Sequence, residues 1–170
     1  MSLELAEIME AVKVKDETDI LKRRCKMEIK IKYRYPDLPE LMPIDGKKSD
    51  WIDLRASEDY DIKKGEFKII DLGVAMELPE GYEAYVVPRS STFKNTGLLL
   101  TNSFGIIDNS FHGPNDFWCF PVVATRDVKI GKGQRIAQFR IMKKQEEIRF
   151  VRSDLEHNSD RGGVGSTGVN

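Results

Sequence analysis

A glycine-rich segment near the end of the chain combines the groups that bind phosphate. Residues 160–168 hold four glycines together with Arg161, Ser166 and Thr167. Glycine permits backbone conformations in which successive N–H groups converge on an anion, and the arginine and the two hydroxyls add further donors. The lysine of a P-loop is absent, and the segment opens no helix. Its composition predicts a phosphate-binding tail, with a disordered polar terminus as the alternative.

Four further segments are polar where a plain β-strand would alternate with apolar side chains. They are residues 53–57, 88–92, 102–113 and 133–139. With the tail they form five blocks in order along the chain. If these blocks form one site, the strands next to each block must bring them together. Any one of these blocks would be weak support for a function.

The composition limits the class of protein. The chain has 170 residues, of which 40% are hydrophobic and 32% charged, so we expect a single domain with one core. A net charge of -1 argues against a nucleic-acid polymer as the partner. Cys25 and Cys119 are too few for a disulfide framework, and no signal peptide is visible. Without an apolar run of about 20 residues, we expect no membrane partner and a cytoplasmic protein.

The chain divides into three parts. In residues 1–26, apolar side chains recur at helical spacing behind Ser2, which predicts a helical or frayed N-terminal arm. A β domain is predicted over residues 27–152. It starts with a half-buried strand from Met27, where apolar and charged side chains alternate, and a proline-rich loop follows over residues 35–49. Residues 153–170 form the expected flexible tail.

The rest of the domain reads as short strands between turn signals, with no helix among them. The expected strands are residues 51–56, 67–70, 74–78, 82–87, 98–101, 117–123, 135–143 and 148–151. Many short strands without helices favour an all-β sandwich, jelly roll or distorted barrel.

The five blocks, taken in order, resemble the five motifs of the trimeric dUTP pyrophosphatases (dUTPases), over about residues 51–168. The resemblance implies a distorted jelly-roll homotrimer with shared active sites. It also implies Mg²⁺-assisted hydrolysis of dUTP to dUMP and pyrophosphate, which limits uracil incorporation into DNA and supplies dUMP for dTMP synthesis.

The resemblance assigns roles around the phosphates. Asp108 occupies the position of the general base that activates the attacking water. Arg89, Ser90, Ser91 and Gln138 match positions that bind the triphosphate. Asp53 matches a carboxylate that reaches the magnesium ion through water, and Arg135 is expected to be a structural ion-pair residue. The tail supplies four further substrate contacts, namely Arg161, Gly165, Ser166 and Thr167.

The third block matches the motif with which members of the family recognise the base and the sugar of the substrate. A hairpin over residues 100–111 is expected, with Asn102 and backbone groups near Gly105 and Ile107 pairing with uracil. Phe111 stands where a tyrosine is usual and would pack under deoxyribose, excluding a 2′-OH. Read without the resemblance, Phe111 would be an ordinary core aromatic.

The tail also departs from the family pattern. Val164 replaces the usual aromatic residue that stacks on the base. Residues 117–120 are a candidate source of a substitute ring, the alternative being that these aromatics belong to the core.

Two rival functions remain open. A dCTP deaminase shares much of the motif pattern, but Trp118 falls where its catalytic glutamate would be, so this function is less favoured. A dUTPase-like regulatory protein that acts through a protein partner is invited only by the arm at residues 1–26. The two histidines, His112 and His157, are not expected to be catalytic because neither has a metal-ligand partner at suitable spacing.

Overall fold

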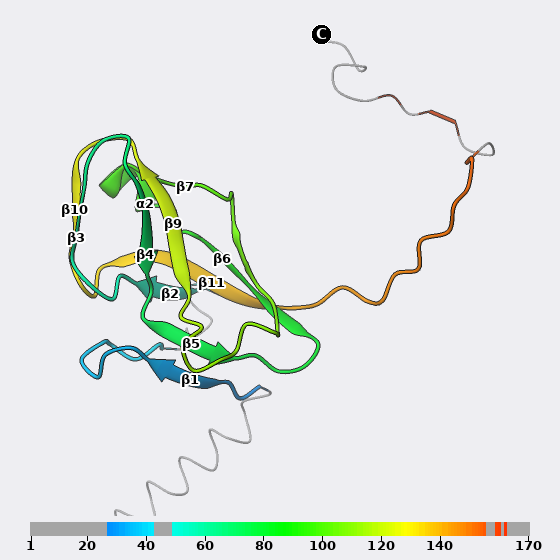
Figure 1. Ribbon diagram of the computed structural model, residues 1–170, viewed down its shortest axis with the longest axis horizontal. Coiled ribbons are helices and arrows are strands. Elements are labelled where there is room, and N and C mark those ends of the chain that lie inside the picture. Colours follow the sequence, from blue (N-terminus) through cyan, green and yellow to red (C-terminus); the bar gives the residue numbers. More distant parts are fainter. Residues whose placement is uncertain (1–26, 43–48, 156–158, 161, 163–170) are drawn as a thin grey trace, which may run out of the picture.

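Short strands joined by turns and loops build most of the described part of this chain (Figure 1). The structure is a computed structural model that describes residues 27–42, 49–155, 159, 160 and 162. The elements in this part are β1 (Lys30–Tyr33), β2 (Ile52–Arg55), β3 (Tyr60–Ile62), β4 (Phe67–Asp71), β5 (Val74–Glu77), β6 (Tyr82–Pro88), α2 (Thr92–Thr96), β7 (Leu98–Leu100), β8 (Gly105–Ile107), β9 (Cys119–Ala124), β10 (Val128–Ile130) and β11 (Arg135–Lys143).

The strands pair antiparallel in two larger and two smaller sheets. The four-stranded sheet has the order β2-β11-β6-β8, and the three-stranded sheet has the order β4-β9-β7. β1 pairs with β5, and β10 pairs with β3. Because β11 pairs with both β2 and β6, it holds together segments that are far apart in the sequence. This all-β jelly-roll arrangement confirms the predicted fold class.

The core lies between the two larger sheets. Leu54 of β2 and Phe139 of β11 contribute from one sheet, and Ile70 of β4 and Val122 of β9 contribute from the other. Trp118, just before β9, is fully buried and packs edge-on against Phe139, with 5.1 Å between the ring centroids. Burial of these large apolar groups supplies the main stabilisation of the fold and fixes the strands that carry the polar blocks.

The domain contains one short helix in its described part, so the prediction of strands without a helix was wrong. α2 spans five residues, too few to show a helical period. It ends at Gly97, whose φ of 72° lies in the left-handed region and whose N–H donates to the carbonyl oxygen of Phe93 at 2.7 Å. A Cβ at Gly97 would lie 2.8 Å from Oγ1 of Thr125, so a side chain would not fit there.

Strand prediction was right for the longer strands and for the three-residue β7, but it failed at three other short strands. β3, β8 and β10 have three residues each and were not predicted. The strand expected over residues 148–151 is also wrong, since this segment pairs with no other strand in the described part of the chain. Its composition favours a strand, but a strand needs a neighbour to bond to.

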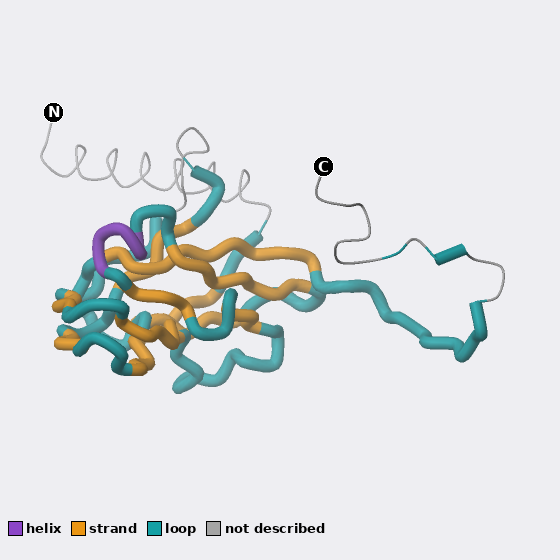
Figure 2. Tube along the Cα trace, turned by 90° about the horizontal axis from the view of Figure 1, so that it is seen from above, coloured by secondary structure: helices purple, strands orange, loops and turns teal. Residues whose placement is uncertain are grey.

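After β11 the chain leaves the body as an extended arm (Figures 1 and 2). The arm comprises residues 144–155 and carries apolar side chains in the open, with Phe150 91% and Val151 74% exposed. The described residues of this arm therefore extend away from the sheets of their own chain.

One prediction lies outside this description. The N-terminal arm at residues 1–26 falls on residues that the structure does not describe. Among the described residues, no helix is long and apolar enough to cross a membrane.

Candidate active site

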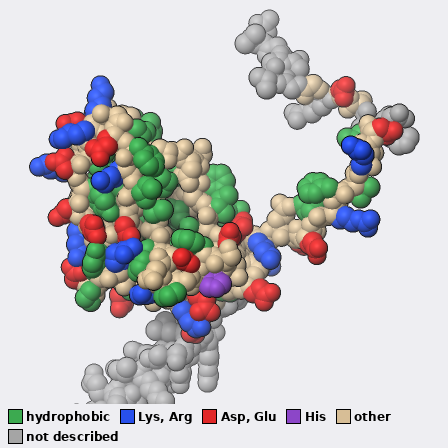
Figure 3. Space-filling model, viewed as in Figure 1, with side chains coloured by type: hydrophobic (Ala, Val, Ile, Leu, Met, Phe, Trp, Pro, Cys, Tyr) green, Lys and Arg blue, Asp and Glu red, His purple; other side chains and the backbone are tan. Residues whose placement is uncertain are grey.

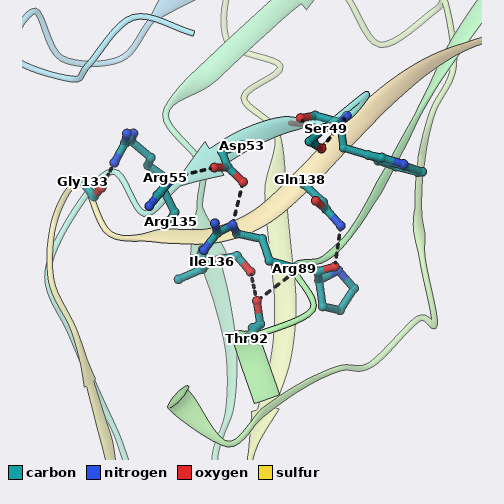
Figure 4. Close-up of polar contacts among 11 residues, drawn as sticks. Ser49, Asp53, Arg55, Arg89, Thr92, Gly133, Arg135, Ile136 and Gln138 are labelled. Atoms are coloured by element: carbon teal, nitrogen blue, oxygen red, sulfur yellow. Dashed lines mark hydrogen bonds and ion pairs between the residues drawn. The ribbon is translucent and has the colours of Figure 1, made fainter. Parts of the chain in front are cut away.

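The first, second and fourth polar blocks meet at one end of the four-stranded sheet (Figure 4). Gln138 on β11 lies between Asp53 on β2 and Val87 on β6 in the strand register. Arg89 follows directly after the end of β6. Side chains alternate between the two faces of a strand, so the burial of Leu54 in the core turns the adjacent Asp53 outward. Three blocks that are distant in sequence are thereby brought together.

Asp53 orients two arginines. Nε of Arg89 donates to Oδ1 of Asp53 at 2.6 Å, and Nη1 of Arg135 donates to Oδ2 at 3.0 Å. Arg89 and Asp53 are half-buried, at 25% and 30% exposure of the side chain, whereas Arg135 is exposed, at 50%. An arginine that is held through Nε still presents its two terminal NH₂ groups, which match the geometry of a phosphate. Arg135 forms the ion pair that the sequence predicted for it.

A threonine that the sequence reading missed fastens the second block to β11. The Thr92 hydroxyl donates to the carbonyl oxygen of Ile136 at 2.8 Å and accepts from the backbone N–H of Arg89 at 3.0 Å. Thr92 is 3% exposed, so both bonds are shielded from water. The loop that carries Arg89 is therefore fixed relative to the strand that carries Gln138. The sequence offered one indication of this role, because Thr92 directly follows two serines at the start of α2.

The remaining residues of this end are open to a ligand. Ser90 is exposed, and Ser91 is partly exposed without a hydrogen bond from its side chain to the start of α2. Gln138 donates from Nε2 to the carbonyl oxygen of Pro88 at 3.2 Å, which fixes the amide and leaves its oxygen outward. The structure thus brings Arg89, Ser90, Ser91 and Gln138 into one polar surface.

The third block differs from the expected hairpin. β7 bonds to β9, whereas β8 bonds to β6, so the two strands belong to different sheets and the turn at residues 101–104 crosses between them. Asn102 is exposed in this turn, and Ser103 adopts a φ of 63°. The hairpin prediction was wrong because sequence spacing cannot tell which neighbours two strands bond to.

Asp108 follows β8 and is held by the serine two residues later. Its Oδ1 accepts hydrogen bonds from the Ser110 hydroxyl and from the Ser110 backbone N–H, the latter at 2.8 Å. These bonds favour the charged carboxylate and hold the pKa of Asp108 below its ordinary value, with the hydroxyl as the largest cause. Asp108 is exposed and ionised at neutral pH, and its Oδ2 remains open to a ligand or to water.

The segment after Asp108 is anchored by an asparagine that was not predicted. Nδ2 of Asn109 donates to the carbonyl oxygens of Leu78 at 2.6 Å and Pro79 at 3.2 Å. Nδ1 of His112 contacts the carbonyl oxygen of Asn109. Phe111 is 39% exposed. The ring of Phe111 therefore does not belong to the core, contrary to the alternative reading of this residue.

A single chain does not bring Asp108 to the surface formed by the other blocks. Ile107 lies opposite Ala84, so Asp108 lies beyond Ala84, whereas Arg89 follows the other end of β6. Along a strand at about 3.3 Å per residue, Ala84 and Arg89 are separated by roughly 16 Å. A general base must lie within about 3 Å of its proton or reach it through one water, so Asp108 cannot act on a phosphate that Arg89 of the same chain contacts.

The predicted tail contacts lie beyond what the structure describes. Arg161, Gly165, Ser166 and Thr167 are all outside the described residues, as is Val164. Of the tail, residues 153–155, 159, 160 and 162 are described, and all of them are exposed.

Residues 117–120 were suggested to supply a ring that stacks on the base in place of Val164. The structure contradicts this suggestion for two of the three aromatic residues in the segment. Trp118 and Phe120 are fully buried. The third, Phe117, is covered by Arg34, whose guanidinium carbon lies 3.8 Å from the ring centroid. The alternation along β9 turns Phe120 into the core, while Trp118 fills the space beside Phe139. The alternative reading of these two rings, as core residues, is correct.

The described residues contain no preformed cluster of metal-ligating side chains. In these ranges, no three His, Cys, Asp or Glu side chains gather in a way that could hold a metal ion. Asp53 is the carboxylate nearest to the phosphate-binding surface, and both of its oxygens already accept a hydrogen bond from an arginine.

Comparison with known proteins agrees with this fold. Residues 42–168 match the sequence model of the dUTPase family. The chain is 59% identical, over 143 residues, to the SPbeta prophage-derived deoxyuridine 5'-triphosphate nucleotidohydrolase of Bacillus subtilis, a match that covers 84% of this chain and 99% of that protein. It is 34% identical to the deoxyuridine 5'-triphosphate nucleotidohydrolase of Neorickettsia sennetsu over 127 residues, covering 72% of this chain and 84% of that protein. The chain belongs to the dUTPase family.

Solved structures show the same fold. The dUTPase of Staphylococcus bacteriophage 80alpha with dUPNHPP superposes with a TM-score of 0.71 at 22% identity, covering 84% of this chain and 99% of that one. The dUTPase of Streptococcus mutans superposes with a TM-score of 0.58 at 23% identity, covering 70% and 98% of the two chains.

Proposed function

We propose that the protein is a dUTP diphosphatase of the cytoplasm, which hydrolyses dUTP to dUMP and pyrophosphate. This reaction limits uracil incorporation into DNA and supplies dUMP for dTMP synthesis. One observation carries the proposal beyond family membership. It is the phosphate-binding surface at the end of β6, where Asp53 orients Arg89 beside Gln138.

The triphosphate binds at this surface. The terminal NH₂ groups of Arg89 neutralise phosphate oxygens, Ser90 and Ser91 donate hydroxyl hydrogen bonds, and the fixed amide of Gln138 bonds to a phosphate or to its hydration water. The tail, residues 153–170, then closes over the phosphates. Its contacts are Arg161, Gly165, Ser166 and Thr167.

Magnesium fits this surface as an ion held chiefly by the substrate. When bound, it neutralises charge on the triphosphate and orients its oxygens. Asp53 reaches it through water. Each oxygen of this carboxylate accepts one arginine bond and keeps a second lone pair for a metal-bound water.

Asp108 activates the attacking water. Ser110 occupies its Oδ1, so Oδ2 is the atom that accepts the proton of the water. The lowered pKa of Asp108 keeps the carboxylate deprotonated at neutral pH, as a base must be.

Uracil and deoxyribose bind at the third block. Asn102 and the backbone of Gly105 and Ile107 read the edge of the base. Gly105 lies close against β6, since a Cβ there would be 3.3 Å from Cβ of Val86, which leaves the narrow space that uracil selection needs. Phe111 packs under the sugar and excludes a ribose hydroxyl.

The active site is shared between copies in a homotrimer. The separation of Asp108 from Arg89 along β6 supports this arrangement, because the base of one chain needs the phosphate-binding surface of another. The extended arm at residues 144–155 supports it too, since the arm leaves the sheets of its own chain with its apolar side chains exposed.

A nucleotide panel tests the proposal. Pyrophosphate release is measured with dUTP, dCTP, dTTP and UTP in the presence of Mg²⁺, and only dUTP should be turned over efficiently. Ammonia release from dCTP would instead indicate a deaminase, and tight binding of dUTP without turnover would indicate a regulatory protein.

Substitution of Phe111 tests the sugar filter. Phe111→Ala removes the ring that blocks the 2′-OH, so the ratio of kcat/KM for dUTP to that for UTP should fall by roughly 10-fold or more. The matched control is Phe104→Ala. Phe104 lies in the same block but packs edge-on against Tyr85, with 5.6 Å between centroids, and should leave the ratio unchanged. An unchanged ratio in Phe111→Ala would place the filter elsewhere.

A further inference from the structure

The carboxylate that we assign as the base lies on a segment that leaves the edge of a sheet. β8 ends at Ile107, and its last pairing is with Ala84 of β6. β8 lies at the end of the strand order β2-β11-β6-β8, so residues 108–112 continue beyond an edge strand. Segments outside a ladder open more readily than residues within a sheet. The position of Asp108 therefore depends on what else holds this segment.

Most side-chain hydrogen bonds of this segment are internal to it. The Ser110 hydroxyl and the Ser110 N–H both donate to Oδ1 of Asp108, and Nδ1 of His112 contacts the carbonyl oxygen of Asn109. The N–H of Phe111 donates to the carbonyl oxygen of Asp108 at 3.2 Å. These bonds shape the segment but do not fix it to the sheets. In the described part of the chain, Asn109 is the one side chain of residues 108–112 that hydrogen-bonds to another segment.

The chemistry of this anchor requires an amide. Nδ2 of Asn109 donates to the carbonyl oxygens of two successive residues, Leu78 at 2.6 Å and Pro79 at 3.2 Å. Both partners are acceptors, so the side chain has to present its NH₂ group, whose two N–H bonds serve the two carbonyls. An aspartate of the same size has no donor when ionised, and an alanine has none at all.

The anchor point is itself firmly held. Leu78 directly follows β5 and is 3% exposed. The N–H of Tyr82 donates to the carbonyl oxygen of Pro79 at 3.1 Å and closes the turn between β5 and β6. The N–H of Lys144, just after β11, donates to the carbonyl oxygen of Gly81 at 2.9 Å. The turn is thus tied to two strands of the four-stranded sheet, and Asn109 links the third block to it.

We propose that Asn109 is a positioning residue, which holds the base Asp108 and the sugar-packing ring Phe111 in place through the β5–β6 turn. The inference rests on the proposed function, because the roles of Asp108 and Phe111 are those given above. Asn109 acts through these two neighbours in the segment. A misplacement of about 1 Å can lower a rate by about 100-fold, so loss of the anchor should impair turnover and sugar discrimination together.

The test is Asn109→Ala, with Asn115→Ala as control. Asn115 is exposed in the turn that follows the same block, and its side chain makes no hydrogen bond among the described residues. In Asn109→Ala, kcat for dUTP should fall by roughly 10-fold or more, and the ratio of kcat/KM for dUTP to that for UTP should fall as well. The control should keep wild-type values. An Asn109→Ala enzyme with unchanged kcat and ratio would overturn the proposal.

Two further readouts separate positioning from general damage. The Kd of a non-hydrolysable dUTP analogue should change less than kcat, because Arg89 and Gln138 bind the triphosphate from other blocks. The bonds from Ser110 to Asp108 lie within the segment and remain in Asn109→Ala. The pH profile of kcat/KM should therefore become lower while its acidic limb stays in place. A limb at higher pH would show that Asn109 acts on the ionisation of Asp108 and would contradict a positioning role.

Asn109→Asp provides a second variant of nearly unchanged size. Its carboxylate would face the carbonyl oxygens of Leu78 and Pro79 without a donor, so kcat should fall at least as far as in Asn109→Ala. Asn115→Asp carries the same change of charge at an exposed position. Charged side chains of both signs are spread over the visible face of the body (Figure 3), so this control should be tolerated. Wild-type kcat in Asn109→Asp would count against the anchor.

Hydrogen–deuterium exchange separates this inference from the proposed function, because it needs no turnover. In the protein without nucleotide, peptides that cover residues 108–112 should exchange faster in Asn109→Ala than in wild type or Asn115→Ala. If wild type does not hydrolyse dUTP but this difference is found, the anchor stands and the proposed function falls. If wild type hydrolyses dUTP and neither exchange nor kcat changes in Asn109→Ala, the proposed function stands and the anchor falls.

Discussion

Replacing Asp108 by asparagine should lower kcat for dUTP by at least about 100-fold, the usual effect of losing a positioned general base. Asparagine keeps the size and one acceptor oxygen of the carboxylate but cannot take a proton from water. The substrate should still bind, since Arg89, Ser90 and Gln138 are unaffected. Steady-state kinetics and equilibrium binding of a non-hydrolysable dUTP analogue measure the two effects separately. Near-normal kcat would remove Asp108 from this role.

The pH dependence provides an independent check of the same residue. kcat/KM falls as pH decreases through the pKa of the base, and the hydrogen bonds from Ser110 keep that pKa below the ordinary aspartate value. Ser110→Ala removes the hydroxyl bond, so the acidic limb should move to higher pH. Ser110→Thr keeps a hydroxyl and should restore the limb. A limb that stays in place in Ser110→Ala would argue against titration of Asp108.

Replacing Trp118 by alanine should destabilise the folded protein by about 3–5 kcal/mol, as for other large aromatic residues in cores. The ring is fully buried against Phe139, and no neighbouring group can fill the resulting cavity without moving the sheets. For a chain of this length, the Tm should fall by roughly 10 °C. Differential scanning calorimetry at one fixed protein concentration measures this, because assembly makes Tm depend on concentration.

The matched control is Trp118→Phe, which keeps a ring in the same space. Nε1 of Trp118 is buried without a hydrogen-bond partner among the described residues, so phenylalanine loses no bond and should cost clearly less than alanine. Equal losses for the two variants would contradict the packing role.

The burial of Trp118 also bears on the alternative function of a dCTP deaminase. A glutamate at this position would face the core and not a substrate.

The sequence predicted the fold class and the family for identifiable reasons. Alternating side chains revealed the longer strands, such as β6 and β11, and the five ordered blocks indicated the family. Arg89, Ser90, Ser91 and Gln138 were chosen as phosphate ligands, and β11 does bring them together with Asp53. Short local patterns were enough to find the blocks because each block is a continuous run of residues.

What the sequence could not predict depends on partners across the chain. α2, β3, β8 and β10 are too short to show a periodic pattern of side chains. The third block was expected to be a hairpin, but β7 and β8 bond to different sheets. Thr92 and Asn109 were overlooked, because their importance lies in the backbone carbonyls that each one reaches. The strand expected at residues 148–151 has no neighbour in its own chain to bond to.

The position of Asp108 and Arg89 at opposite ends of β6 has a genetic consequence. In the proposed trimer, a catalytic centre combines the base of one subunit with the phosphate-binding surface of another. A defect in the third block and a defect in the second block, carried by different alleles, then fall partly into different centres of a mixed trimer. Some centres receive both intact halves. Two alleles that are each inactive alone would therefore complement one another in a cell that expresses both, which alleles of a self-contained active site cannot do.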